Sequence, residues 1–171
     1  MENKRNLIYS GAALAAAALL VGLDQWTKHL AVVHLKGKPS VVLADGVMEL
    51  TYLENRGAAF GLLQGQQWLF YILTAVFVAL VCWAVWRMPK TRRFMPLYAV
   101  LIVLTAGALG NFIDRVVHQY VVDFFSFVLI HFPIFNVADI YVTLSAAAFF
   151  ILILFYYKDE DYHVFFPSKG R

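Results

Sequence analysis

Long uncharged, apolar stretches recur four times along this chain and are separated by shorter polar connections. A helix needs about 20 mainly apolar residues to cross the hydrocarbon core of a bilayer, with a lower limit of about 17, and each stretch meets that limit. The pattern therefore predicts four transmembrane helices. These helices are expected over about residues 7–33, 68–86, 94–115 and 139–157.

The first predicted helix is interrupted by polar residues. Its alanine-rich core follows Lys4 and Arg5, which is also the arrangement of a secretory signal sequence. However, Asp24 and Lys28 follow that core in helical register, and apolar residues resume at 30–33. We therefore expect one uncleaved helix here rather than a signal sequence that is removed.

Two longer connections, over about residues 35–65 and 116–138, are predicted to lie on one side of the membrane. The first holds two β-rich pieces, 41–43 and 48–53, with an Ala-Asp-Gly turn between them, which predicts a hairpin in a small sheet at the membrane surface. The second is rich in Phe, Val and Ile but is interrupted by Pro133, which indicates an interfacial segment with short structure.

The composition agrees with a membrane protein and excludes a soluble domain. Of the 171 residues, 61% are hydrophobic and 15% are charged, whereas about a quarter of the residues in soluble domains are charged. The net charge of +3 does not indicate nucleic-acid binding, because the cations cluster beside the apolar stretches. We interpret residues 1–171 as a single all-α polytopic membrane domain of four transmembrane helices with a small extracytoplasmic β-rich platform.

The positions of the cations also predict an orientation. Lys and Arg residues are most frequent before the first helix, between the second and third helices, and after the fourth, and these three places share one side of the membrane. Cytoplasmic loops carry an excess of Lys and Arg, so both termini are predicted to be cytoplasmic. The segments 35–65 and 116–138 would then face outward.

Several polar residues gather at the predicted outer boundary of the membrane, where ionisable groups are costly and often mark function. Asp24 ends the apolar core of the first helix. Asp114 and Arg115 end the third helix, and Asn111 lies on the same helix face as Asp114. Local ion pairs with the neighbouring cations are the structural alternative to a functional role.

Asp123 and Asp139 are harder to explain as structural residues. Asp123 lies among Val and Phe residues without a neighbouring cation, and Asp139 opens the fourth helix. Two carboxyl groups in a poorly hydrated site share a proton, because like charges at short range do not both ionise cheaply. One carboxylate can then activate water while its protonated partner polarises a carbonyl group. Such a pair can hydrolyse a peptide bond without a metal.

Five motifs, read together, resemble those of the lipoprotein signal peptidases, also called signal peptidase II. The motifs are Asp-Gln-Trp-Thr-Lys at 24–28, Asn-Arg-Gly-Ala-Ala-Phe at 55–60, Gly-Ala-Leu-Gly-Asn-Phe-Ile-Asp-Arg at 107–115, Val-Val-Asp-Phe at 121–124 and Phe-Asn-Val-Ala-Asp at 135–139. They occur in the order of that family and with similar spacings. The resemblance covers essentially the whole chain.

The resemblance implies roles for eight residues. Asp123 and Asp139 match the catalytic pair of the family. The residues that match polar groups supporting or lining the site are Asp24, Asn55, Asn111, Asp114, Arg115 and Asn136. The implied activity is that of an aspartyl endopeptidase of the bacterial cytoplasmic (inner) membrane. It would remove the signal peptide of a lipid-modified prolipoprotein by cleaving before the diacylglyceryl-cysteine at the outer face.

Other kinds of chemistry fit the sequence less well. The five histidines lack the spacing of zinc proteases and no serine elbow is recognisable, so we expect neither a metal nor a cofactor. The runner-up is a small proton- or ion-coupled transporter, because membrane carboxylates also relay protons. A non-catalytic interaction subunit is a third interpretation. The expected partners are the prolipoprotein substrate and membrane lipids, and no nucleic acid.

Overall fold

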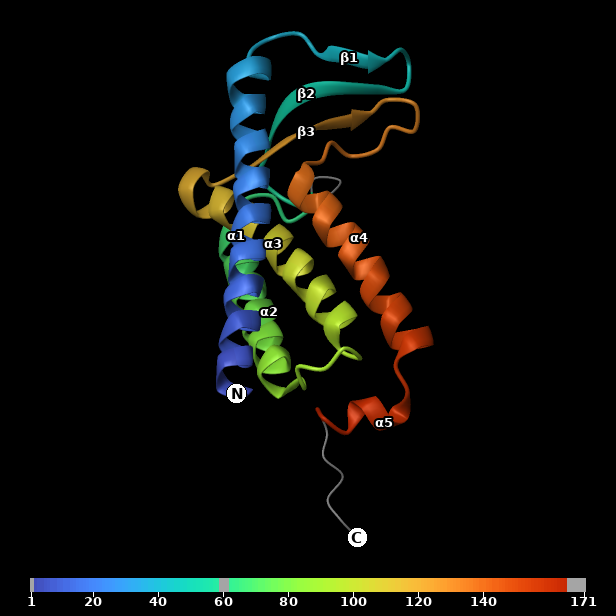
Figure 1. Cartoon of the computed structure of the whole chain (residues 1–171). Helices are drawn as coiled ribbons and strands as arrows, with labels where there is room; N and C mark the ends of the chain where they lie inside the picture. Colours follow the sequence, from blue (N-terminus) through green and yellow to red (C-terminus); the bar gives the residue numbers. More distant parts are fainter. Residues whose placement is uncertain (1, 59–61, 166–171) are drawn as a thin grey trace.

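The computed structural model describes residues 2–58 and 62–165. Its described part consists of helices with one small sheet at their end (Figure 1). In chain order the elements are α1 (Glu2–Leu35), β1 (Val41–Ala44), β2 (Met48–Asn55), α2 (Gln67–Arg87), α3 (Met95–His118), β3 (Val121–Phe127), α4 (Val137–Ile151), the π-helix η2 (Leu152–Tyr156) and α5 (Asp159–Tyr162).

Three of the described helices are long and apolar enough to cross a membrane. They are α2, α3, and α4 together with its π-helical continuation to Tyr156. The longer α1, of 34 residues, is not among them, and it carries Asp24, Gln25 and Lys28 in its second half. Three of the four predicted helices are therefore candidate membrane spans, and the presence of four membrane helices stays a prediction.

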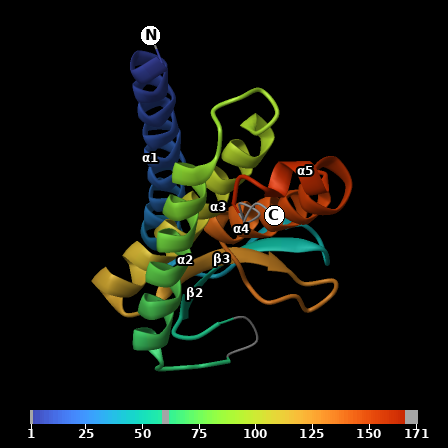
Figure 2. The same cartoon turned by 90° about the horizontal axis from the view of Figure 1, so that it is seen from below.

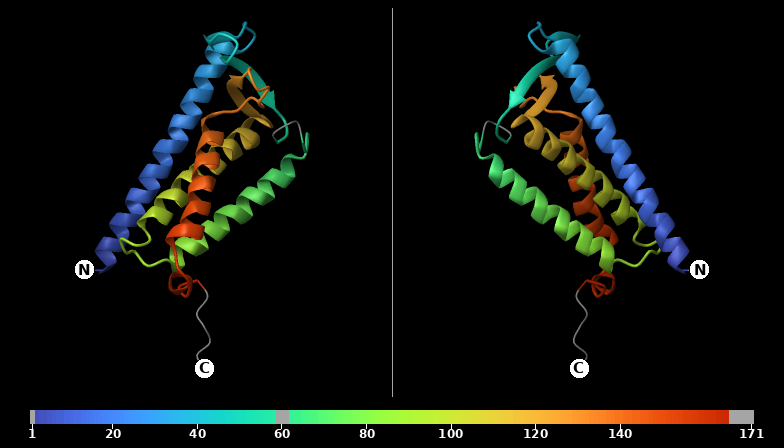
Figure 3. Two further views of the ribbon diagram at one scale, coloured as in Figure 1. Left: turned by 90° about the vertical axis from the view of Figure 1, so that its right-hand side faces the viewer. Right: turned by 90° about the vertical axis from the view of Figure 1, so that its left-hand side faces the viewer.

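Helix α3 is central, because it packs against α1, α2 and α4 (Figures 2 and 3). Small residues allow the backbones to approach closely, as is common between membrane helices. A Cβ atom on Gly107 would lie 2.6 Å from the carbonyl oxygen of Ala138 in α4, and Gly110 lies against Asp24 of α1. The polar residues at this end of α3 are thereby held between α1 and α4.

The sheet is antiparallel, in the order β1-β2-β3. Strands β1 and β2 form the predicted hairpin, and Gly46 has a φ of 67° in its turn, a conformation that glycine adopts without strain. The sequence did not reveal β3 as a strand. Its residues 121–124 are all buried, so the strand lacks the alternation of apolar and polar residues that identifies a half-buried strand.

A small hydrophobic cluster attaches β3 to α1. Its buried members are Ala31 and Leu35 from the end of α1 and Val122 and Phe124 from β3. The side chains of these two β3 residues flank Asp123 in sequence, so their burial fixes the position of the strand at that residue. The packing of β3 against α1 therefore fixes the position of Asp123 relative to the ends of the helices.

Gly107→Leu is expected to destabilise the fold, because its side chain would force apart the backbones of α3 and α4. Overpacking of this kind costs about 1–3 kcal/mol. Thermal unfolding of the purified protein in detergent measures the effect as a lower melting temperature. Gly22→Ala is the matched control, since a Cβ atom there meets open space. Equal melting temperatures for the two variants would contradict the tight α3–α4 contact.

Candidate active site

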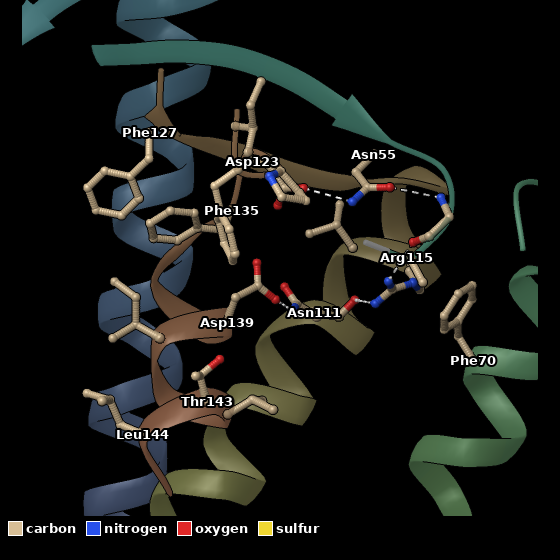
Figure 4. A pocket seen from close by; sticks show the side chains of 18 of the residues that line it. Asn55, Phe70, Asn111, Arg115, Asp123, Phe127, Phe135, Asp139, Thr143 and Leu144 are labelled. Carbon is tan, nitrogen blue, oxygen red and sulfur yellow. Dashed lines mark hydrogen bonds between the residues drawn. The ribbon is translucent and has the colours of Figure 1, made fainter. Parts of the chain in front are cut away.

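Asp123 from β3 and Asp139 from the first turn of α4 line one cavity of about 580 Å³ (Figure 4). The sequence separates these residues by a loop, and the return of the chain from β3 to α4 brings them to the same space. The rest of the lining is mainly apolar and includes Phe127 and Phe135. The two carboxyl groups therefore lie at one mainly apolar cavity.

Asn136 joins the two aspartates. Its side-chain amide donates a hydrogen bond of 2.6 Å to Oδ1 of Asp123, and its backbone N–H donates one of 3.0 Å to Oδ2 of Asp139. The same residue is the N-cap of α4, where its side-chain oxygen accepts the N–H of Asp139. Asn and Asp are favoured at this position because they satisfy the free N–H groups of the first turn. One residue thus begins the helix and bridges the pair.

Each of the four carboxylate oxygens of the pair accepts a hydrogen bond from an N–H group. In addition to the two bonds from Asn136, Nδ2 of Asn55 lies 2.9 Å from Oδ2 of Asp123. Nδ2 of Asn111 lies 2.8 Å from Oδ1 of Asp139. Donors on every oxygen stabilise negative charge on the pair and fix both carboxyl planes.

The pKa of Asp123 is raised from 3.8 to about 7. Burial is the main cause, since the residue is only 1% exposed. The nearby carboxyl of Asp139 raises the value further, whereas the hydrogen bonds from Asn55 and Asn136 lower it. Desolvation and like charge both favour the protonated form. The Asp123 carboxyl therefore changes protonation state near neutral pH.

A buried ion cluster lies behind the pair. The Lys28 ammonium is 2.9 Å from Oδ2 of Asp24 and 3.2 Å from Oδ2 of Asp114, and all three side chains are buried. Gln25 donates hydrogen bonds to both carboxylates. The pairing of Asp114 with Arg115 that the sequence suggested as a local alternative is not observed. Asp114 instead binds Lys28 across the α1–α3 interface.

The same cluster holds the backbone next to each aspartate of the pair. Oδ1 of Asp24 accepts the N–H of Ala138 at 2.9 Å, directly before Asp139. Oδ2 of Asp114 accepts the N–H of Val122 at 3.0 Å, directly before Asp123. These contacts join α1 to α4 and α3 to β3. The ion cluster thereby positions the two chain segments that carry the pair.

Arg115 points into the other side of the cavity (Figure 4). Its guanidinium group donates to the carbonyl oxygens of Asn111 and Gly57, both at 3.2 Å, and lies 4.2 Å from the ring centre of Phe70. These contacts hold a positive charge over an aromatic face at the cavity wall. Arg115 thus connects α3 with the segment after β2 and with α2.

The eight residues singled out in the sequence fall into two groups. Five of them line the cavity, namely Asn55, Asn111, Arg115, Asp123 and Asp139. Asn136, Asp24 and Asp114 lie behind the cavity and contact the pair or its backbone. Lys28 and Gln25 complete the buried cluster but were not chosen as site residues. The sequence feature that could have identified them is their position close to Asp24 within an otherwise apolar helix.

Within the described ranges, no group of three or more His, Cys, Asp or Glu residues is arranged to hold a metal ion. The expectation that this site works without a metal remains a prediction, which is tested below.

Comparison with known proteins gives consistent results. The model of the family described as signal peptidase (SPase) II matches residues 16–155. A lipoprotein signal peptidase of Streptococcus thermophilus is 40% identical over 146 residues, covering 85% of this chain and 92% of the relative. One of Brevibacillus brevis is 43% identical over 143 residues, covering 84% and 93%.

Two solved structures of bacterial membrane enzymes share the fold. Each has a TM-score of 0.72 to this chain. One is 30% identical, covering 84% of this chain and 88% of its own, and the other is 33% identical, covering 86% and 95%.

The raised pKa of Asp123 predicts a pH-dependent stability. This carboxyl has a pKa of about 7 in the folded chain and an ordinary value of 3.8. Its contribution to stability is therefore full below pH 3.8 and is lost as the pH rises through about 7. Asp123→Asn lacks the titrating group. Its melting temperature in detergent, minus that of the wild type, is expected to increase between about pH 4 and about pH 8.

The exposed hairpin residue Asp45 supplies the control for this measurement. Asp45→Asn removes a carboxyl group from the exposed turn, and its difference from the wild type is measured over the same pH range for comparison. A constant or falling difference for Asp123→Asn would contradict the raised pKa.

Proposed function

We propose, from the premise that this chain belongs to the signal peptidase II family, that Asp123 and Asp139 are its catalytic residues. The chain is a membrane aspartic peptidase that removes signal peptides from prolipoproteins. One observation carries the assignment of residues: the buried carboxyl group of Asp123 and the half-buried carboxyl group of Asp139 line one mainly apolar cavity and are bridged by Asn136. A carboxyl pair that shares one proton supplies both the base and the acid that peptide hydrolysis needs.

The reaction follows from the protonation of the pair. The ionised carboxylate takes a proton from water as the water oxygen attacks the scissile carbonyl carbon. The protonated partner donates its hydrogen to the carbonyl oxygen, which gives a tetrahedral diol. The C–N bond then breaks as the leaving nitrogen takes a proton from the pair, and one hydroxyl of the diol returns its proton to the pair, which yields the carboxylic acid and restores the single shared proton. The shared proton belongs to Asp123 and Asp139 jointly, because a coupled pair titrates as a unit.

The supporting residues keep the pair in the geometry for this reaction. Asn55, Asn111 and Asn136 donate to its oxygens. Asp24 and Asp114 hold the adjacent backbone. The guanidinium of Arg115 supplies the one described positive charge that lines the wall of the 580 Å³ cavity. A substrate peptide bound there would place its backbone carbonyls between this cation and the pair.

We place the cleavage before a diacylglyceryl-cysteine. The cavity is lined largely by Phe, Ile and Val side chains, which suits the apolar end of a signal peptide. Leu144 of α4 also lines it, although this residue lies in a candidate membrane span and is 65% exposed. The cavity therefore reaches the surface of α4 that would face lipid. A substrate whose acyl chains remain in the bilayer could enter along this side.

The proposed topology has four membrane helices, with α1 as the fourth. Helix α1 packs against α3 and begins at the end opposite the sheet (Figures 1 and 3). The connection between α2 and α3 lies at that same end and carries four cations between residues 87 and 93. An excess of cations is typical of the cytoplasmic side. Both termini would be cytoplasmic, and the sheet and the pair would face outward from the inner membrane.

The alternative function, a small proton- or ion-coupled transporter, has no support in the comparisons, since the named relatives are peptidases. A proton relay also needs carboxylates along a path across the bilayer. Here Asp24, Asp114, Asp123 and Asp139 gather at one end of the helices. Binding of membrane lipids and the lack of nucleic-acid binding remain predictions.

Removing either catalytic carboxyl is expected to abolish cleavage. Asp123→Asn and Asp139→Asn keep the size of the side chain but cannot exchange a proton at neutral pH. Each should lower kcat on a purified lipid-modified precursor by at least about 1,000-fold, and the double variant should be little worse, because residues that act as a unit are non-additive. Precursor binding and the melting temperature serve as controls for folding. Substantial turnover by a folded single variant would remove that aspartate from the mechanism.

Cleavage is also expected to survive a chelator, because the carboxyl pair itself activates the water. The assay is precursor cleavage with and without EDTA, followed by addition of zinc. Activity that disappears with EDTA and returns with zinc would show that the pair needs a metal and would contradict the mechanism.

A further inference from the structure

We infer that Lys28 is a positioning residue of the catalytic pair and acts through the side-chain amide of Asn111. The inference rests on the proposed catalytic role of Asp123 and Asp139. It assigns to the buried ammonium group a task beyond holding α1 against α3, namely the choice of which end of the Asn111 amide faces Asp139.

The two ends of the Asn111 side-chain amide differ in what they can bind. The side chain of Asn111 has one oxygen that accepts hydrogen bonds and one NH₂ group that donates them. The Lys28 ammonium can only donate, and it lies 2.9 Å from Oδ1 of Asn111. That oxygen is therefore held toward Lys28. The NH₂ group is left to face Asp139, where Nδ2 lies 2.8 Å from Oδ1.

Without the Lys28 contact, the Asn111 amide could reverse. Besides Lys28, Nδ2 of Asn136 donates to the Asn111 oxygen at 3.1 Å. The same Nδ2 group also donates to Oδ1 of Asp123 at 2.6 Å. A reversed Asn111 amide would set its oxygen against an oxygen of Asp139. Two acceptors repel each other unless one carries a proton. The reversed amide would therefore hold a proton on Asp139. The two carboxyl groups would then no longer share one proton, as the proposed mechanism requires.

The Lys28 ammonium group is held in place by its own contacts. Its three donor hydrogens have three partners, since the ammonium contacts Asp24, Asp114 and Asn111. The side chain is 3% exposed and is closed in by the α1–α3 contact. An ammonium held on three sides does not swing away, so the orientation of the Asn111 amide is fixed before substrate binds. Such preorganisation is what a catalytic constellation needs.

The ionisable groups around this contact come from each packed element. They are Asp24 on α1, Asp114 and Arg115 on α3, Asp123 on β3, and Asp139 and Tyr141 on α4. The positive charge of Lys28 also lowers the pKa of Asp123. Loss of Lys28 is therefore expected to move the acidic side of the pH–rate profile upward, both by the reversed amide and by the missing charge.

The test is a double-mutant cycle on the full chain, with Lys28→Met, Asn111→Ala and the two combined. The measured quantities are kcat and KM for cleavage of a purified lipid-modified precursor. Each single variant is expected to lose about 100-fold or more in kcat with less than about a threefold change in KM. The combined variant should lose much less than the product of the two single losses in kcat, because Lys28 has no amide left to orient. The acidic limb of the Lys28→Met profile should move to higher pH by about half a unit or more.

A second set of variants covers the case in which Lys28→Met does not fold, since it leaves two buried carboxylates without their cation. Asp24→Asn with Asp114→Asn keeps an oxygen for the N–H groups of Ala138 and Val122. Lys28→Met and Asn111→Ala are then compared in that neutral background with the same cycle. Lys36→Met is the matched control, because Lys36 pairs with Glu54 at 2.8 Å on the surface, away from the pair. Its kcat and pH profile should match the wild type.

Two results would overturn the inference. One is a combined variant whose loss is the product of the two single losses, since Lys28 would then act independently of Asn111. The other is a folded Lys28→Met variant with the wild-type pH profile, as expected of a residue that only supports the fold. A wild-type chain that fails to cleave precursor would instead count against the proposed function, so the two failures are distinguishable.

Discussion

The buried ammonium of Lys28 between Asp24 and Asp114 is the interaction on which the site depends. Removing one partner of a buried ion pair typically costs about 3–5 kcal/mol, because the remaining charge is left without compensation. Here the loss would also affect the backbone beside the two aspartates of the pair. The same two carboxylates accept the backbone N–H groups directly before Asp139 and Asp123. The cluster therefore ties the packing of α1 against α3 to the placement of both aspartates that we propose as catalytic.

Opposed effects set the protonation of the proposed catalytic pair. Burial and the neighbouring carboxyl raise the pKa of Asp123 toward 7, whereas the amide donors of Asn55 and Asn136 act against that rise. Stronger donors would keep both groups ionised, and fewer donors would keep both protonated. Asn136 contributes to this balance while also capping α4. A substitution of Asn136 would consequently affect both the start of α4 and the protonation of the pair.

The sequence predicted much of this arrangement, and its failures have physical reasons. The motifs placed Asp123, Asp139 and their supporting residues, and apolar runs located the helices. The run before Pro133 concealed β3, because a strand buried on both faces has no alternating pattern. The partner of Asp114 was also missed. Neighbouring side chains on a helix do not face each other, so Asp114 turns to Lys28 while Arg115 turns toward Phe70.

The exposed edge of the cavity at Leu144 has a consequence for how such an enzyme meets its substrate. A site entered from the hydrocarbon side samples molecules that are already dissolved in the bilayer and diffuse in two dimensions. The quantity that sets occupancy is then the number of substrate molecules per lipid, not their number per volume of solution. Dilution of the membrane with inert lipid would slow the reaction as dilution with water slows a soluble enzyme, whereas the volume of buffer around the vesicles would be immaterial.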